Sequence, residues 1–135
     1  MNAPFICETE ADSRALMANK AFTSIMKGAR ESELTLVGIG STPNENVSQN
    51  MMRYDMQNVK KLTNSNVCRD ICSNFYDIYG NICNSPLCRQ FVKVNLEEIS
   101  NHKCVVGIAG GNHKVAFILG TLNGHYLDML IIDKN

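Results

Sequence analysis

The segment with the clearest chemical potential is a turn containing two glycines and a lysine, residues 107–114, which reads GIAGGNHK. An apolar run ends at Gly110 and Gly111, and Lys114 follows where an amphipathic pattern begins. Adjacent glycines permit positive φ angles and bring bare backbone close to a ligand. The first amide N–H groups of a helix lack internal partners, and the helix dipole adds partial positive charge there. Together with the ammonium group of Lys114, this turn predicts a site for a phosphate or a carboxylate.

The same residues also allow a purely geometric interpretation of this glycine–lysine turn. In that interpretation the glycines only let a strand pass into a helix, and the lysine is solvated. The phosphate-binding motif G-x-x-x-x-G-K-[ST] and the dinucleotide motif G-x-G-x-x-G are both unmatched here, so neither decides between the two interpretations.

Two further groups could line the same crevice. The loop GIGST contains Gly38, Gly40 and Ser41 and follows a predicted strand, although alone it is equally consistent with a simple loop. Asp70 stands in CRDIC between apolar neighbours. Burying an unpaired acid is costly, so Asp70 is either a turn residue or paired for a purpose. If it faces Lys114, the lysine could hold a phosphate while the carboxylate accepts sugar hydroxyl groups.

The cysteines do not predict a metal site. The chain contains Cys7, Cys68, Cys72, Cys83, Cys88 and Cys104. Four of them have the spacing C-x3-C-x10-C-x4-C, which lacks the paired C-x2-C of structural zinc sites. Without a secretory signal an even count does not imply disulfides, so we expect free, mostly buried thiols. No cofactor motif and no pairing of a catalytic nucleophile with a base is found.

Composition indicates a single globular domain over residues 1–135 that is able to bury a real core. Hydrophobic residues make up 44% of the 135, and charged residues make up 19%. Thirteen basic and thirteen acidic residues give zero formal charge, so no overall field would attract nucleic acid or an anionic membrane. Without a signal peptide or a continuous apolar run of about 18–20 residues, we expect a cytoplasmic protein.

The elements that position these residues follow the pattern of an α/β protein. We expect strands at 34–39, 103–109 and 127–132, helices at 13–32 and 112–122, one or two short helices within 48–62, and a short helix at LEEIS. The segment 66–86 predicts a hairpin or an irregular excursion, with a turn at Gly80 and Asn81. The last strand–helix–strand unit is a crossover, which implies a parallel sheet. The fold class is therefore an open, Rossmann-like, mostly parallel sheet flanked by helices. Three strands are few for such a sheet, so we expect an incomplete half of a larger domain.

The ordered motifs ELTLVGIGS, CRDICSNFYDIYGNIC and VVGIAGGNHKVAFILGTLNGHYLDMLIID resemble the successive signatures of one family. This family is the sugar-binding domain of SorC-type bacterial transcription regulators, which are often grouped with DeoR. The opening NAPF…ADSRALM resembles the segment that enters the second half of that domain, so the resemblance covers nearly the whole chain.

The resemblance implies an N-terminal helix-turn-helix in the whole regulator and an effector domain related to sugar-phosphate isomerases. It implies a phosphorylated sugar, or a similar phosphorylated small molecule, as the effector. The family's lysine in A-G-G-x-x-K is similar in position to Lys114, and its acid in G-D-I to Asp70; both contact the effector. The G-I-G-S loop of the family corresponds to Gly38, Gly40 and Ser41.

Two departures from the family pattern affect this carry-over. Arg69 stands where the family usually has glycine before the acid, and the last strand ends in Asp133, Lys134 and Asn135 instead of an acid–alanine–threonine helix start. We also expect the helix-turn-helix and an early phosphate-binding loop to be absent from this chain.

The leading hypothesis is therefore the effector-binding domain of a regulator, and not an enzyme. It would act in a homo-oligomer, with operator DNA bound only through the missing N-terminal domain. One alternative is an isomerase- or deaminase-like enzyme acting on a sugar phosphate, for which Asp70 is the only candidate base. A second alternative is a plain oligomerisation module.

Overall fold

The computed structural model describes residues 4–40 and 67–134, with only the backbone described for 67–69. Two predictions fall outside these residues, namely the short helices expected within 48–62 and the site residue Ser41. Within the described ranges, no helix is both long enough and apolar enough to cross a membrane.

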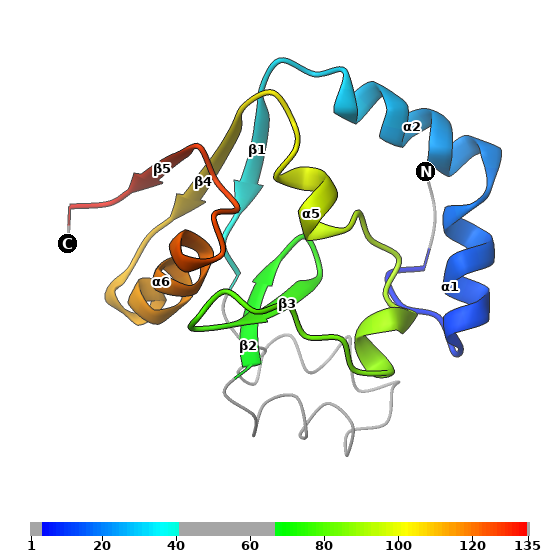
Figure 1. Ribbon diagram of the computed structural model, residues 1–135, viewed down its shortest axis with the longest axis horizontal. Helices are drawn as coiled ribbons and strands as arrows, with labels where there is room; N and C mark the ends of the chain where they lie inside the picture. The colour runs from blue at the N-terminus through cyan, green and yellow to red at the C-terminus, as the bar shows by residue number, and fades with distance from the viewer. Residues whose placement is uncertain (1–3, 41–66, 135) are drawn as a thin grey trace.

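The fold contains a three-stranded parallel sheet, which lies toward the upper left of Figure 1. Its strands are β1 (Thr35–Gly38), β4 (Val105–Ala109) and β5 (Met129–Ile132), with β4 in the middle. Several of their residues are β-branched, and such residues favour extended backbone. The predicted α/β fold with a mostly parallel sheet flanked by helices is confirmed. The two strands that lead into the glycine-containing loops, β1 and β4, are direct neighbours.

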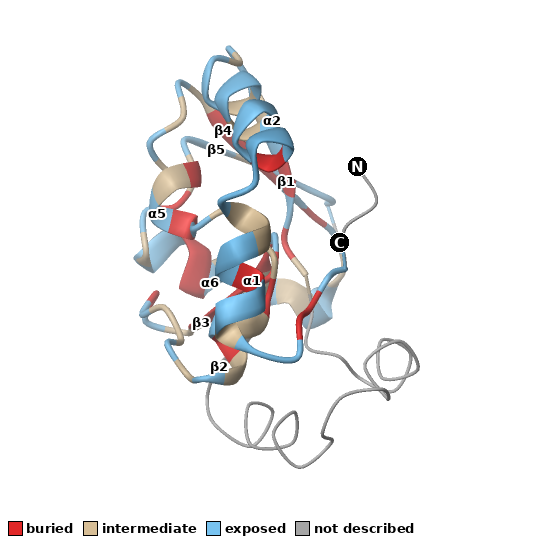
Figure 2. Ribbon diagram, turned by 90° about the vertical axis from the view of Figure 1, so that its right-hand side faces the viewer, coloured by how far each residue is buried: buried red, intermediate tan, exposed pale blue. Residues whose placement is uncertain are grey.

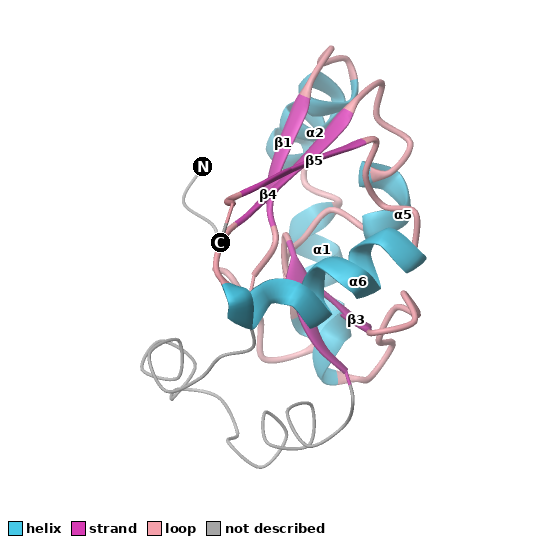
Figure 3. Cartoon of the chain, turned by 90° about the vertical axis from the view of Figure 1, so that its left-hand side faces the viewer, coloured by secondary structure: helices cyan, strands magenta, loops and turns pink. Residues whose placement is uncertain are grey.

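The crossover predicted at the C-terminal end is also present. After β4 the chain forms one turn of 3-10 helix, η2 (Asn112–Lys114), and then α6 (Val115–Asn123) leads to β5. Gly120 lets α6 approach the backbone at Asp77 of the same chain closely, because a Cβ at Gly120 would overlap the carbonyl oxygen of Asp77. Figure 3 shows the three strands at the top of the view with α6 below them.

A β-hairpin forms the predicted excursion from the sheet. Its strands, β2 (Val67–Ile71) and β3 (Asn74–Asp77), pair in antiparallel fashion. The turn between them consists of Cys72 and Ser73, with φ angles of 50° and 66°. Both residues are therefore left-handed, a conformation that L-residues other than glycine seldom adopt.

A second return of the chain follows β3. Gly80 has a φ of 86°, and beyond it Ile82 pairs with Tyr76 in an antiparallel bridge. The turn predicted at residues 80–81 is confirmed, but it is not the turn that closes the hairpin.

Two helices occupy the N-terminal segment, where the sequence predicts a single helix over 13–32. They are α1 (Glu10–Met17) and α2 (Lys20–Arg30). Asn19 separates them, because its side-chain oxygen accepts a hydrogen bond from the backbone N–H of Ala21 at 2.8 Å and so caps a new helix. The apolar stripe that predicts one helix over 13–32 continues across this break.

The core has two parts, which are visible as the red interior segments of Figure 2. The larger part joins the sheet, the hairpin and the short helix α5 (Leu96–Ile99), which was predicted at LEEIS. The smaller part lies beside the 3-10 helix η1 (Leu87–Gln90), where the rings of Phe75 and Phe91 have centroids 5.2 Å apart.

One face of the sheet carries exposed apolar side chains. In the observed register Leu36 and Met129 lie in one row across the sheet, and Ile108 and Ile131 lie in the next. All four side chains are exposed, with Leu36 at 60%. Parallel sheets are normally covered on both faces, so these four exposed side chains form an apolar surface that such a sheet would usually bury.

Candidate functional site

Lys114 lies at the carboxyl end of the sheet, as the sequence predicts for a ligand site there. It is the last residue of η2 and occupies the N-cap position of α6. Its ammonium group donates a hydrogen bond to the backbone carbonyl of Ile39, at 2.5 Å. Ile39 directly follows β1, so the lysine of one loop reaches the end of the neighbouring strand. The two predicted loops therefore meet at one edge of the sheet.

The glycine corner before Lys114 already binds a carboxylate from the same chain. Gly111 has a φ of 94°, and its N–H donates to a side-chain oxygen of Asp133 at 2.9 Å. The positive φ predicted for both glycines occurs at Gly111, whereas Gly110 is not among the glycines with positive φ. Gly110 instead passes close to Asp133, since a Cβ there would lie 3.3 Å from the same oxygen. An anion entering this corner would have to compete with the carboxylate of Asp133.

Gly40 brings the end of the first loop against Asp70. The N–H of Gly40 donates to the backbone carbonyl of Asp70 at 2.7 Å. A Cβ at Gly40 would lie 3.0 Å from a carboxylate oxygen of Asp70, so a side chain there would crowd the acid. Gly38 is the exposed last residue of β1. Of the predicted loop residues that the structure describes, Gly40 is the one with a contact to Asp70.

Asp70 is a largely buried acid in an incompletely satisfied environment. Burial raises its pKa from 3.8 to about 6, while a hydrogen bond from the backbone of Ser73 and the charge of Lys93 act in the opposite direction. One of its carboxylate oxygens is buried and has no hydrogen-bond partner among the described residues. Near neutral pH this carboxyl group is therefore able either to accept or to donate a hydrogen bond to a ligand.

The pairing of Asp70 with Lys114 that the sequence suggests is replaced by other contacts. Lys114 bonds to the backbone of Ile39, and the cation whose charge acts on Asp70 is Lys93. Asp70 thus lies against Gly40 and feels the charge of Lys93. Sequence reasoning missed Lys93, although it stands between Val92 and Val94, which is the same kind of signal that singled out Asp70.

Lys93 belongs to a cleft of about 710 Å³ that the sequence did not predict. The cleft lies between α1, the segment 82–95 and α5, and its lining is rich in charged and amide side chains. The predicted residues Lys114, Gly110 and Gly111 do not line it. Its walls come from parts of the chain about 70 residues apart, which no local pattern could bring together.

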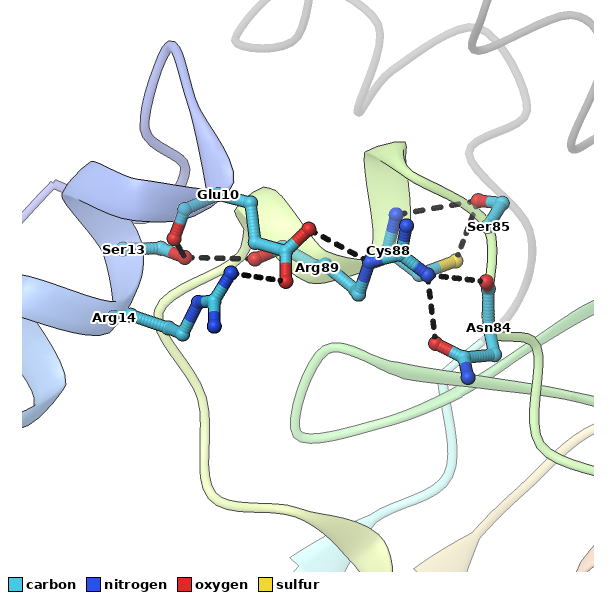
Figure 4. Close-up of polar contacts among 7 residues, drawn as sticks. All are labelled: Glu10, Ser13, Arg14, Asn84, Ser85, Cys88 and Arg89. Atoms are coloured by element: carbon cyan, nitrogen blue, oxygen red, sulfur yellow. Dashed lines mark hydrogen bonds and ion pairs between the residues drawn. The ribbon is translucent and has the colours of Figure 1, made fainter.

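Most of the charge in the cleft wall is already paired (Figure 4). Glu10 accepts from Arg14 at 3.0 Å and from Arg89 at 2.8 Å, and Arg89 also donates to the backbone carbonyl of Asn84 at 3.0 Å. Ser13 completes the connection through a 2.7 Å hydrogen bond to the backbone carbonyl of Arg89. The contacts of Arg89 with Glu10 and Ser13 fasten α1 to η1, whereas Arg14 pairs with Glu10 within α1.

Lys93 differs from the arginines of the cleft. In the described ranges no ion pair or hydrogen bond of its ammonium group is found. Burial lowers its pKa, and the nearby groups of Cys88, Cys83, Asp70 and Glu97 partly offset this. In residues 4–40 and 67–134, no cluster of three or more His, Cys, Asp or Glu side chains could hold a metal ion.

Comparisons with known proteins agree on one family. The model of a family described as a putative sugar-binding domain matches residues 1–135. The deoxyribonucleoside regulator of Bacillus subtilis (strain 168) is 27% identical over 132 residues, which are 98% of this chain and 42% of that protein. The sorbitol operon regulator of Klebsiella pneumoniae is 26% identical over 131 residues, 97% of this chain and again 42% of the relative.

Solved structures give the same result. A transcriptional regulator from Streptococcus pneumoniae TIGR4 superimposes with a TM-score of 0.87 at 26% identity, covering 100% of this chain and 52% of the other. The full-length sorbitol operon regulator SorC from Klebsiella pneumoniae gives a TM-score of 0.84 at 25% identity, covering 99% of this chain and 44% of the other. This chain thus spans about half the length of the proteins it resembles. They are named as regulators and not as enzymes, which counts against the isomerase or deaminase alternative.

Proposed function

Since this chain belongs to the putative sugar-binding domain family of SorC- and DeoR-type transcription regulators, we propose that it senses a phosphorylated sugar for such a regulator. The two curated relatives are named for deoxyribonucleosides and for sorbitol, both polyhydroxylated molecules. A ligand of this class needs several hydrogen-bond acceptors and donors, and its phosphorylated form needs a cation as well.

The observation that carries the proposal is the hydrogen bond from Lys114 to the carbonyl of Ile39. It holds an ammonium group at the carboxyl end of β1, where ligands of open parallel sheets bind. Lys114 would hold the phosphate, and the N–H of Gly111 would add a donor once Asp133 is displaced. Asp70 has one buried carboxylate oxygen without a partner among the described residues. Its carboxylate would accept hydrogen bonds from the sugar hydroxyl groups.

We propose that residues 1–135 form one part of a larger effector domain, because the chain covers 42% of each curated relative. Operator DNA would be contacted by another part of the longer protein, in keeping with the zero formal charge of this chain. The longer protein would act in the cytoplasm as a homo-oligomer whose operator affinity changes when the effector binds.

Calorimetric titration with pairs of ligands, each sugar phosphate beside its unphosphorylated sugar, tests the role of Lys114. The full-length protein containing this chain would be compared with its Lys114→Gln variant. Loss of a hydrogen bond to a charged group costs about 1.5–3 kcal/mol, so affinity for the phosphorylated ligand should fall about 10- to 150-fold. Affinity for the unphosphorylated sugar should change little.

Lys103→Gln provides a matched control. Lys103 is an exposed lysine that pairs with Glu33 at 2.8 Å, and it lies at the opposite, amino end of β4. This variant should bind every ligand as the unmodified protein does. If Lys114→Gln leaves the phosphate preference intact, or if both variants reduce it equally, the assignment of Lys114 is wrong.

A further inference from the structure

Cys83 and Cys88 face each other in the wall of the cleft. Their sulfur atoms are 3.1 Å apart. Cys88 is buried, Cys83 is half-buried, and both line the cleft, so a small molecule in the cleft can reach the pair. The five described cysteines are free thiols, and this is the one pair among them whose sulfur atoms are in contact.

The backbone holds both cysteines in place. The N–H of Cys83 donates to the carbonyl of Phe75 at 2.7 Å, which ties it to β3. The N–H of Cys88 donates to the hydroxyl oxygen of Ser85 at 3.2 Å, and that hydroxyl group donates to the Cys88 sulfur at 3.1 Å (Figure 4). A disulfide has an S–S length of about 2.05 Å, so the sulfur atoms need to approach by only about 1 Å.

We propose that Cys83 and Cys88 form a redox-modification site at which a hydroperoxide converts the two thiols into an intramolecular disulfide. The proposal does not depend on the identity of the effector. In the first step the thiolate of Cys83 attacks one oxygen of the peroxide, the O–O bond breaks, and the other oxygen leaves as an alcohol or water after taking a proton. Cys83 is then a sulfenic acid, oxidised by two electrons.

In the second step the sulfur of Cys88 attacks the sulfur of that sulfenic acid. The S–S bond forms, the S–O bond breaks, and the hydroxide leaves as water with the proton of Cys88. In total two thiols and one hydrogen peroxide yield one disulfide and two waters, so atoms and electrons balance.

The surroundings assign different roles to the two thiols. Cys83 is the more accessible sulfur, and its exposure to the cleft makes it the group that meets the peroxide. Burial raises the pKa of Cys88 and so disfavours its thiolate, which leaves Cys83 as the thiol that reacts first with the peroxide. Lys93 lines the same cleft; burial lowers its pKa, and the charges of Cys88 and Cys83 partly offset this.

Peptide mapping of the 135-residue chain after treatment with hydrogen peroxide tests the proposal. Free glutathione is present during the peroxide treatment as a reference thiol. The oxidised protein is then denatured in an excess of alkylating reagent. Trypsin leaves Cys72, Cys83 and Cys88 on one peptide, residues 70–89, and cleavage after Tyr79 by chymotrypsin then detaches Cys72. We expect the peptide of residues 80–89 to carry no alkyl group and to weigh two hydrogens less than the reduced peptide. Treatment with dithiothreitol before alkylation should restore both alkylated thiols.

Two variants make the map decisive. Cys72→Ser removes an exposed cysteine from the hairpin turn and should leave formation of the disulfide unchanged. Cys83→Ala should abolish it and leave Cys88 alkylatable. The proposal is overturned if Cys83 and Cys88 both remain alkylated when the reference glutathione is fully oxidised, or if the disulfide links either of them to Cys72. The map of the unmodified chain gives this answer even if a variant does not fold.

Discussion

Replacing Asp70 by asparagine should stabilise the protein at neutral pH. Burial raises the pKa of this carboxyl group from 3.8 to about 6, so the folded protein holds the proton more tightly than the unfolded chain does. Between these two pKa values the folded state binds more protons, and the free energy of unfolding therefore falls as the pH rises from about 4 to about 6. Above pH 6 the full cost of burying the charge is present. Asparagine has a similar shape and carries no charge at any pH.

The size of the effect follows from the shift in pKa. A difference of roughly 2 units, at 1.36 kcal/mol for each unit, corresponds to about 3 kcal/mol. The amide oxygen of asparagine can still accept the hydrogen bond from Ser73, so most of this difference should appear in the variant. For a domain of this size we expect the midpoint of thermal unfolding to rise by about 5–10 °C at pH 7.5.

Urea unfolding of Asp70→Asn and of the unmodified chain, measured from pH 4 to pH 8, gives both free energies directly. The gain should be close to zero at pH 4, should grow through pH 5 and 6, and should stay constant above pH 7. Glu33→Gln removes an exposed carboxylate that pairs with Lys103, and this control should change the free energy of unfolding little at any pH. If Asp70→Asn instead destabilises the protein at pH 7.5, the carboxylate has a stronger favourable partner than the structure shows, and the reasoning is refuted.

Two other substitutions test the packing. Gly120→Ala should lower the free energy of unfolding in urea by about 1–3 kcal/mol, because its Cβ would overlap the backbone of Asp77. Gly28→Ala, within α2, should raise it by about 0.5–1 kcal/mol, because the space around its Cβ is open. Equal effects of the two alanines would contradict the close approach of α6 and β3. Ile131→Thr should lower the binding of a hydrophobic dye such as ANS while leaving the thermal midpoint within about 2 °C, because its side chain is 55% exposed on the apolar sheet face. An unchanged dye signal would mean that this face is covered in solution.

Local sequence patterns were sufficient for most of the sheet. Short apolar runs marked all three parallel strands, and the crossover between the last two follows from their spacing. The glycine corner and Lys114 were placed correctly at the carboxyl end of the sheet. The reason is that a loop leading from a strand to a helix always begins at the carboxyl end of that strand. The family resemblance stated from three ordered motifs is confirmed by the family match over residues 1–135.

Features that depend on distant parts of the chain were not predictable in the same way. The hairpin turn at Cys72 and Ser73 has no glycine or asparagine at its left-handed positions, so nothing local marks it. The carboxylate that occupies the glycine corner comes from Asp133, and the cation that acts on Asp70 comes from Lys93. Each of these partners lies about 20 residues away in the sequence, beyond the reach of a periodicity or a turn motif.

The position of Asp70 affects how binding experiments on this protein should be designed. Its backbone holds the loop beside Lys114, and its side chain is coupled to Lys93 in the cleft, so any substitution of Asp70 alters stability and site together. Because the protonated acid and an asparagine are both neutral, the unmodified protein below pH 5 should resemble Asp70→Asn. A change in sugar affinity between pH 5 and pH 7.5 that occurs only in the unmodified protein therefore measures the carboxylate alone. Lys114→Gln carries no such ambiguity, because its partner is a backbone carbonyl, and its effect on phosphate preference should persist at both pH values.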